Sequence, residues 1–202
     1  MPQIPTNELN CVAIVPSKGE SQRILHKNKQ IVGEYPLYEH AVRCADKTGV
    51  FDMIYISTDD TQIRDNVVQN LNAIPFIHPK ILLGEFSSVD CVVWDILVKI
   101  DYRADSFCVL LPTSPLRTPK LVRDMYHEFC LTKCDCMMSF SPNGGKHDGT
   151  AIFCDTLAFL KYRDFWRIPN MSPYYIPEKY SLDIDVPDDL TEARERYGTR
   201  KG

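Results

Sequence analysis

The chain reads CVAIV at Cys11–Val15, and the loop PSKGESQRILHKN follows directly at Pro16–Asn28. An unbroken apolar run of this length, ended by a proline, is typical of a strand that is buried on both faces of a sheet. Beyond the loop, Leu37–Thr48 carries apolar residues at three- and four-residue spacing, which predicts a helix. A buried strand, a loop and a helix in this order form the first unit of a parallel α/β sheet.

The same alternation continues along the chain. Further buried strands are expected at Met53–Ser57, Ile74–Ile77, Phe107–Leu111, Cys136–Phe140 and Thr150–Cys154. Further helices are expected at Thr61–Asn72, Ser88–Tyr102, Leu121–Lys133 and from Pro187 to about Tyr197. We therefore predict one α/β domain over residues 1–202, with a mostly parallel central sheet flanked by helices. Residues 1–10 are a candidate disordered N-terminus, and Lys161–Pro177, rich in aromatics and prolines, is expected to be the least regular part.

The composition narrows the class of protein. The 202 residues carry a net charge of −4, which argues against a general nucleic-acid surface. No apolar run reaches the roughly 18 residues of a membrane span, and Met1–Asn10 lacks the layout of a signal peptide. Most of the eight cysteines lie in apolar runs and are expected to be buried thiols, although Cys134 and Cys136 form a C-x-C pair. We expect a cytoplasmic protein without a nucleic-acid or membrane partner.

In sheets of this kind, ligands bind beyond the carboxyl ends of the strands, where the loop Pro16–Asn28 is placed. This loop holds Lys18, Arg23 and Lys27 against the single acid Glu20, and its glycine and serines let backbone N–H groups approach a ligand. The loop suits a triphosphate, although it lacks the spacing of a Walker loop. The alternative is an exposed basic turn.

Asp183 and Asp185 stand two apart in a stretch that is expected to end a strand, so both carboxylates should leave the same face. Two adjacent carboxylates repel each other unless a cation lies between them, and oxygen ligands favour Mg²⁺. Helix capping does not explain them, because Pro187 suits the first helical position and places Val186 at the N-cap. The alternative is two solvated acids before a helix.

Two further turns follow expected strands. Pro112–Arg117 contains two prolines, two hydroxyls and an arginine, which suit either a polar ligand or a self-bonded turn. Thr58–Asp60 is most simply the N-cap of the next helix.

At these positions the chain resembles the acylneuraminate cytidylyltransferases, which are CMP-sialic acid synthetases, with their pseudaminic and legionaminic acid relatives and, more distantly, the CMP-Kdo synthetases. Val15–Asn28 is similar to the family motif I-P-A-R-G-G-S-K-x-I-P-x-K-N, and Ser57–Asp60 to its S-T-D-D turn. Leu111–Arg117 is similar to Q-P-T-S-P-L-R, and Asp183–Leu190 to D-I-D-x-P-x-D-L. The matches follow the family's order along nearly the whole chain.

The resemblance implies a Rossmann-like sandwich of the nucleotide-diphospho-sugar transferase type (GT-A-like) and a reaction. The anomeric hydroxyl of a sialic or other nonulosonic 2-keto acid would attack the α-phosphorus of CTP, with release of pyrophosphate. By similarity Lys27, Asp183 and Asp185 would be catalytic, the two acids holding Mg²⁺ (or Mn²⁺). The implied nucleotide-binding residues are Val15, Pro16, Ser17, Lys18, Gly19, Ser21, Gln22, Arg23, Asn28, His78, Ser87 and Ser88. The implied sugar-binding residues are Leu111, Pro112, Thr113, Ser114 and Arg117.

The chain departs from the family pattern at several of these positions. Lys18 and His78 replace arginines, Gln22 replaces a lysine, Glu20 a glycine, and Leu111 a glutamine expected to touch the sugar. Losing one unit charge at ~4 Å is worth ~1–4 kcal/mol. Two alternatives therefore stand beside the leading one: a degenerate, non-catalytic nucleotide-binding protein, or an enzyme with another acceptor such as Kdo.

The segment 140–148 is shorter than in sialate synthetases, whose insert at this point clasps the partner subunit. We therefore expect a monomer, or a dimer that uses another surface.

Overall fold

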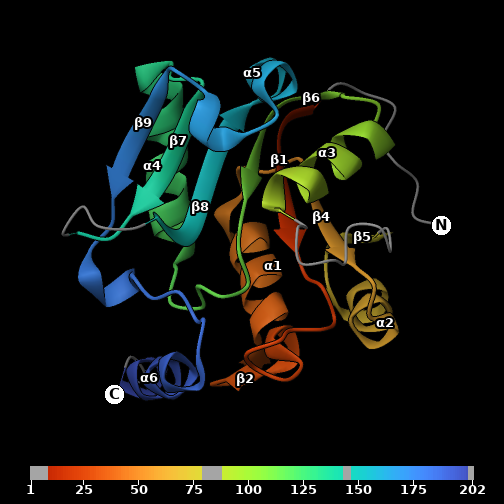
Figure 1. Ribbon diagram of the computed structural model, residues 1–202, viewed down its shortest axis with the longest axis vertical. Coiled ribbons are helices and arrows are strands. Elements are labelled where there is room, and N and C mark those ends of the chain that lie inside the picture. The colour runs from red at the N-terminus through yellow and green to blue at the C-terminus, as the bar shows by residue number, and fades with distance from the viewer. Residues whose placement is uncertain (1–8, 79–87, 143–146, 200–202) are drawn as a thin grey trace.

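The computed structural model describes residues 9–78, 88–142 and 147–199. Its seven-stranded sheet has the order β5-β4-β1-β6-β8-β7-β9 (Figure 1). The strands are β1 (Leu9–Pro16), β4 (Met53–Thr58), β5 (Ile74–Ile77), β6 (Ala104–Val109), β7 (Cys136–Phe140), β8 (His147–Asp155) and β9 (Met171–Tyr175). The four strands β5, β4, β1 and β6 run parallel, whereas β8 is antiparallel to both neighbours and β9 is parallel to β7.

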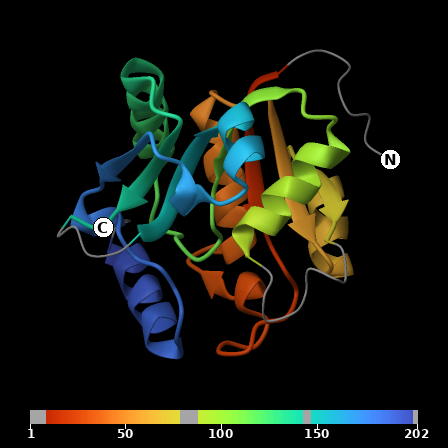
Figure 2. The ribbon, with the colours of Figure 1, turned by 45° about the horizontal axis from the view of Figure 1, so that its top comes forward.

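Helices cover both faces of the sheet, and each face has its own apolar core. The helices α1 (Leu37–Thr48), α2 (Thr61–Asn70) and α4 (Pro119–Thr132) pack on one face. The helices α3 (Val89–Lys99) and α5 (Thr156–Tyr162) pack on the other, as Figure 2 shows. Alternate residues of β1 divide between the two cores, since Ala13 and Val15 enter the first and Val12 and Ile14 the second. This explains why the strand is apolar without interruption.

A third, smaller cluster lies beyond the carboxyl ends of the central strands. It joins α6 (Pro187–Gly198) to the short hairpin of β2 (Ile31–Val32) and β3 (Tyr35–Pro36), with Ile184 buried between them. Figure 1 shows α6 and β2 together below the sheet. The cluster therefore ties the segment before α6 to the loop after β1.

Most expected elements are confirmed. The strands at β4, β5 and β7 and the helix α1 lie within one residue of the expected bounds, and β6 begins and ends earlier than expected. The stretch Lys161–Pro177 is more regular than expected, because it contains the 3₁₀ turn Phe165–Arg167 and the whole of β9. α5 was not expected. β1 already begins at Leu9, so the last two residues of 1–10 are ordered, and residues 1–8 lie outside the described part.

Three further features complete the fold. Each of the two edge strands contains a proline, Pro75 in β5 and Pro173 in β9.

The eight cysteines are free, and burial raises the pKa of the Cys11 thiol to about 12. Within the described ranges, no helix has the length and apolar character that crossing a bilayer requires.

Candidate functional site

A cavity of about 260 Å³ opens at the carboxyl ends of β1, β5 and β6. It collects residues that are far apart in the sequence. The lining residues are Pro16, Ser17, Lys18, Lys27, Asn28, His78, Ser88, Val89, Val92, Leu111, Pro112, Thr113, Asp183 and Asp185. The loop after β1, His78 after β5 and the turn after β6 therefore meet the segment that precedes α6.

Lys27 forms the link between the first loop and that segment. It begins the 3₁₀ turn Lys27–Lys29, and its side chain is only 14% exposed. Its Nζ donates to the carbonyl oxygen of Ile184 at 2.8 Å and lies 3.4 Å from Oδ1 of Asp185. The lysine and the acid pair thus lie side by side in the same cavity.

The segment around Asp183 and Asp185 is not a strand, contrary to the expectation. It is held instead by its backbone, because the Ile184 N–H donates to the Thr113 carbonyl at 2.9 Å and the Ile184 side chain is fully buried. With Ile184 anchored inward, the acids on either side both line the cavity. The expectation that they share a face is therefore confirmed by another route.

The carboxylate of Asp183 is the most constrained polar group of the site. Its Oδ1 is buried and has no hydrogen-bond partner among the described residues. Burial, and after it the negative charge of Asp185, raises the pKa of Asp183, against a hydrogen bond from Thr113 that lowers it. A buried acceptor without a donor beside a second carboxylate suits a cation.

The donor set fits a divalent ion that is shared with a ligand. The described residues contain no group of three or more His, Cys, Asp or Glu side chains placed to hold a metal. Mg²⁺ usually binds through one or two carboxylates and completes its shell with water and substrate phosphates. Asp183 and Asp185 can supply the protein ligands of such an ion.

Asp185 is more exposed than Asp183 and is held by cations. Its Oδ1 lies 2.9 Å from a guanidinium nitrogen of Arg23, and its backbone N–H donates to Asp189 at 2.7 Å. Asp189 also accepts the N–H of Val186, the N-cap residue of α6, at 2.8 Å. The capping work is thus done by Asp189, which leaves both acids of the pair available to the cavity.

The loop after β1 is held in place by the two acids that follow β4. Asp59 accepts the Gly19 N–H at 2.7 Å, and Asp60 pairs with Lys29 at 2.7 Å while it caps α2 through the N–H groups of Gln62 and Ile63. A Cβ at Gly19 would meet the Cβ of Asp60 at 3.0 Å, which explains a glycine there. The expected capping role of Thr58–Asp60 is confirmed, and a bracing role that the sequence did not indicate is added.

Replacing Asp59 by Ala is expected to raise the KM for nucleotide about tenfold, because one charge-assisted hydrogen bond that positions the loop is lost. Steady-state kinetics at varied CTP concentration measures the effect. Asp65→Ala, which removes an exposed acid of α2 paired to Arg64, is the matched control and should leave KM unchanged. An unchanged KM for Asp59→Ala would contradict the bracing role.

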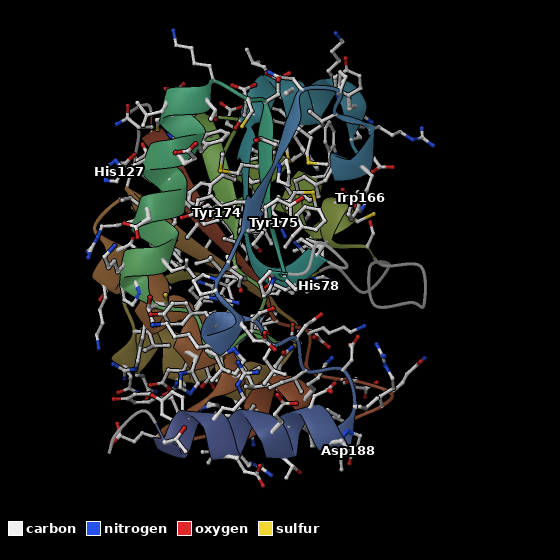
Figure 3. The ribbon with its side chains drawn as sticks, turned by 90° about the vertical axis from the view of Figure 1, so that its left-hand side faces the viewer. His78, His127, Trp166, Tyr174, Tyr175 and Asp188 are labelled. Atoms are coloured by element: carbon white, nitrogen blue, oxygen red, sulfur yellow. The ribbon has the colours of Figure 1, made fainter. Side chains whose placement is uncertain are left out.

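The wall opposite the acids is formed by buried polar groups. Ser17 is fully buried, its N–H donates to the Ser57 carbonyl at 2.8 Å, and its Oγ has no partner among the described residues. His78 is also buried, and its Nδ1 lies 2.8 Å from the Ser57 hydroxyl. Figure 3 shows His78 between the end of the sheet and α6. Ser88 caps α3 through the N–H of Cys91, and Ser87 lies outside the described residues.

The other expected nucleotide residues are not all at the cavity. Val15 lies in the core behind it, and Gly19, Ser21, Gln22 and Arg23 belong to the loop but do not line the cavity. Asn28 lines the cavity and also donates to the Lys18 carbonyl at 2.8 Å, so it shapes the loop.

The expected sugar-binding turn divides into two parts. Leu111, Pro112 and Thr113 line the cavity. Ser114 is buried and donates to the Asp148 carbonyl at 2.6 Å, and Arg117 is buried and donates to the carbonyl groups of Leu111 and Gly149. Ser114 and Arg117 therefore hold the turn from behind. Val89 and Val92, which sequence reasoning missed, add an apolar patch from α3.

The chain is similar to known cytidylyltransferases. Residues 12–125, more than half of the chain, match the family model described as cytidylyltransferase. A CMP-N,N'-diacetyllegionaminic acid synthase of Legionella pneumophila is 32% identical over 118 residues, which are 57% of this chain and 51% of that protein. A pseudaminic acid cytidylyltransferase of Campylobacter jejuni is 24% identical over 221 residues, with 92% of this chain and 95% of that protein covered. The chain thus spans about half the length of the first relative and nearly all of the second.

Solved structures support the fold. A CMP:2-keto-3-deoxy-manno-octonic acid synthetase in complex with CTP has a TM-score of 0.75 at 13% identity, over 95% of this chain and 99% of that chain. A Mycobacterium tuberculosis protein in complex with manganese has a TM-score of 0.68 at 15% identity, over 94% and 100%. With the family match over residues 12–125, the conclusion is that this chain belongs to the cytidylyltransferase family.

Proposed function

We propose that the protein transfers CMP from CTP to the anomeric hydroxyl of an acidic 2-keto sugar of the nonulosonic type and releases pyrophosphate. One observation carries the proposal: Lys27 lies beside the pair Asp183 and Asp185 in a single cavity at the carboxyl ends of the strands. The named relatives that act on legionaminic and pseudaminic acid support the acceptor class.

Lys27 is placed to neutralise the triphosphate. Its ammonium is largely shielded from water, so its charge acts at lower dielectric than a surface charge would. Arg23 and Lys18 add positive charge at the rim of the same loop. Phosphoryl transfer depends mainly on positioning and on charge neutralisation, which these side chains provide.

Asp183 and Asp185 would hold a divalent ion, Mg²⁺ or Mn²⁺, which supplies Lewis-acid stabilisation of the charge that builds on the leaving pyrophosphate. The protein's own contribution is to orient the two carboxylates, through the buried side chain of Ile184 and its backbone bonds to Thr113 and Lys27. The raised pKa of Asp183 means that the ion also offsets the cost of keeping this acid charged.

The remaining walls would bind the base and the acceptor. The Ser17 hydroxyl, which has no partner among the described residues, the backbone of Pro16 and Ser17, and the side chains of His78 and Ser88 would offer polar contacts to cytosine. Leu111–Thr113 would face the sugar. Leu111 offers no hydrogen bond where the resemblance leads us to expect an amide, so the acceptor would differ from sialic acid or bind more weakly.

The reaction is tested by incubating the protein with Mg²⁺, each of the four nucleoside triphosphates and a panel of eight- and nine-carbon keto acids, and by following pyrophosphate. Release with CTP and one acid is the expected result. Release with another nucleotide, or only with an unrelated acceptor, would replace the proposed substrates. CTP binding without turnover on the whole panel would favour a non-catalytic nucleotide-binding protein.

Only residues 141–146 connect β7 and β8. We propose that the protein is a monomer, or a dimer through a surface other than an insert at this position. Sedimentation at several protein concentrations distinguishes these states.

A further inference from the structure

A second cavity of about 260 Å³ lies between α1 and α4, and it shares no lining residue with the first. Figure 1 shows these two helices on the same face of the sheet. The lining residues are Tyr35, His40, Arg43, Cys44, Lys47, Pro115, Arg117, Thr118, Pro119 and Tyr197. Three of them are cations with permanent charge, and none is an acid, in a chain whose net charge is −4.

Arg117 is the decisive residue of this cavity. The residue is only 6% exposed, yet its Nε and Nη1 have no hydrogen-bond partner among the described residues. Its remaining nitrogen, Nη2, donates to the backbone carbonyls of Leu111 and Gly149. A buried guanidinium with two nitrogens that make no hydrogen bond is costly unless an acceptor, and preferably an anion, completes it.

Two other groups add positive potential to the same space. Lys47 is exposed and forms no ion pair with a described residue. α4 begins at Pro119 and is 14 residues long, so the positive end of its dipole lies at the cavity. The Thr118 hydroxyl caps the Leu121 N–H at 3.2 Å, Val122 donates to the Thr118 carbonyl and Pro119 has no N–H, so the helix end contributes mainly its dipole.

Arg43 contributes less charge than the other two cations. Its Nε lies 2.6 Å from the Glu39 carboxylate, and its guanidinium stacks 4.4 Å from the centre of the Tyr35 ring. Burial lowers the pKa of His40, so this ring is mainly neutral near pH 7. Lys47, Arg117 and the end of α4 therefore define the site.

We propose that this cavity binds a small phosphate-type oxyanion, at a site separate from the nucleotide cavity. Arginine nitrogens in a fixed fork match the oxygen spacing of a phosphate, and a helix N-terminus with a lysine completes a tetrahedral anion. The source is either free phosphate or pyrophosphate, or the phosphate group of a small metabolite. The proposal does not depend on the transferase activity.

Hydrogen bonds connect this site to the first cavity. Arg117 donates to the carbonyl of Leu111, and Leu111 and Thr113 line the nucleotide cavity. Thr113 in turn accepts the N–H of Ile184, between the two acids. An anion that orders Arg117 would therefore stabilise the turn Leu111–Thr113, to which the segment of the acid pair is hydrogen-bonded.

Binding is tested by calorimetry in the Lys27→Ala variant of the whole 202-residue chain, in which the proposed phosphate contacts of the first cavity are weakened. Inorganic phosphate, pyrophosphate and glycerol 3-phosphate are the probes. We expect at least one to bind, and the tightest identifies the source. Adding Lys47→Glu should weaken that binding at least ~10-fold, because a nearby charge is reversed at a residue that is exposed and outside the core.

Two further variants make the test specific. Arg117→Lys keeps the charge but loses the fork, so it should weaken binding as well; circular dichroism checks that it folds. Lys161→Glu makes the same charge change as Lys47→Glu on α5, across the sheet, and should leave affinity unchanged. The proposal is overturned if no probe binds the Lys27→Ala protein, or if Lys47→Glu and Lys161→Glu bind equally well.

Discussion

Asp183→Asn should reduce turnover by ~10³-fold or more, because the change removes the buried carboxylate that would hold the divalent ion, and metal stabilisation of the leaving group is worth several kcal/mol. The amide keeps the size of the side chain and its contact with Thr113. Pyrophosphate release at saturating CTP and Mg²⁺ measures the loss. A variant with near-native turnover would contradict the metal role of the acid pair.

The same variant should leave the metal-free protein as stable as the wild type at pH 7, or more stable. The pKa of Asp183 is raised in the folded state, so the folded protein binds more protons than the unfolded chain in the window above the ordinary carboxyl pKa. Stability contributed by this group is present below that window and is lost as the pH rises through the folded-state pKa. Thermal melts without metal at acidic and neutral pH should therefore show the difference between Asn and Asp growing with pH.

Asp188 provides the matched control. Asp188 is the second residue of α6 and is exposed. Figure 3 shows it pointing outward at the start of that helix. Asp188→Asn removes the same charge and should leave turnover unchanged. A comparable loss in this control would mean that net charge near α6, not metal binding, explains the Asp183 result.

Lys27→Met should lower kcat/KM by roughly one to three decades, because a shielded charge close to the triphosphate is worth ~1–4 kcal/mol. The side chain keeps its length and most of its packing, so the loss reports the charge and the hydrogen bond to Ile184. Lys27→Arg should recover only part of the activity, since a planar guanidinium does not reproduce a compact ammonium.

Lys161→Met is the control for this change, because Lys161 is exposed on α5 and lies outside the cavity. Isothermal calorimetry with CTP separates binding from chemistry. If Lys27→Met binds and turns over CTP like the control, the lysine serves only to fasten the Ile184 segment.

The sequence predicts the central strands well, because a strand that is buried on both faces is apolar at successive positions. β1 and β4 are apolar for this reason, and the parallel direction follows from the helices between the strands. The direction of β8 could not be read, since an apolar run has the same pattern in a parallel and an antiparallel strand. β9 was missed because Met-Ser-Pro-Tyr-Tyr has neither a strand alternation nor a continuous apolar run.

The sequence predicts several of the residues that belong to the site, but not which residues of each motif line the cavity. Lys27, Asp183 and Asp185 meet as expected, because loops at the carboxyl ends of parallel strands converge. Arg117 and Ser114 belong to the same motif as Thr113, yet they do not line the cavity, since their side chains are bonded to the carbonyls of Gly149 and Asp148 at the start of β8. Asp59 was underrated, because its bond to Gly19 joins residues 40 positions apart and no local pattern records it.

Both edge strands of the sheet carry a proline, Pro75 in β5 and Pro173 in β9. A proline offers no N–H, so a neighbouring strand that tried to add to β5 or β9 would lack one rung of the ladder. The protein should therefore resist edge-to-edge polymerisation when it is concentrated, even though its sheet is open on both sides.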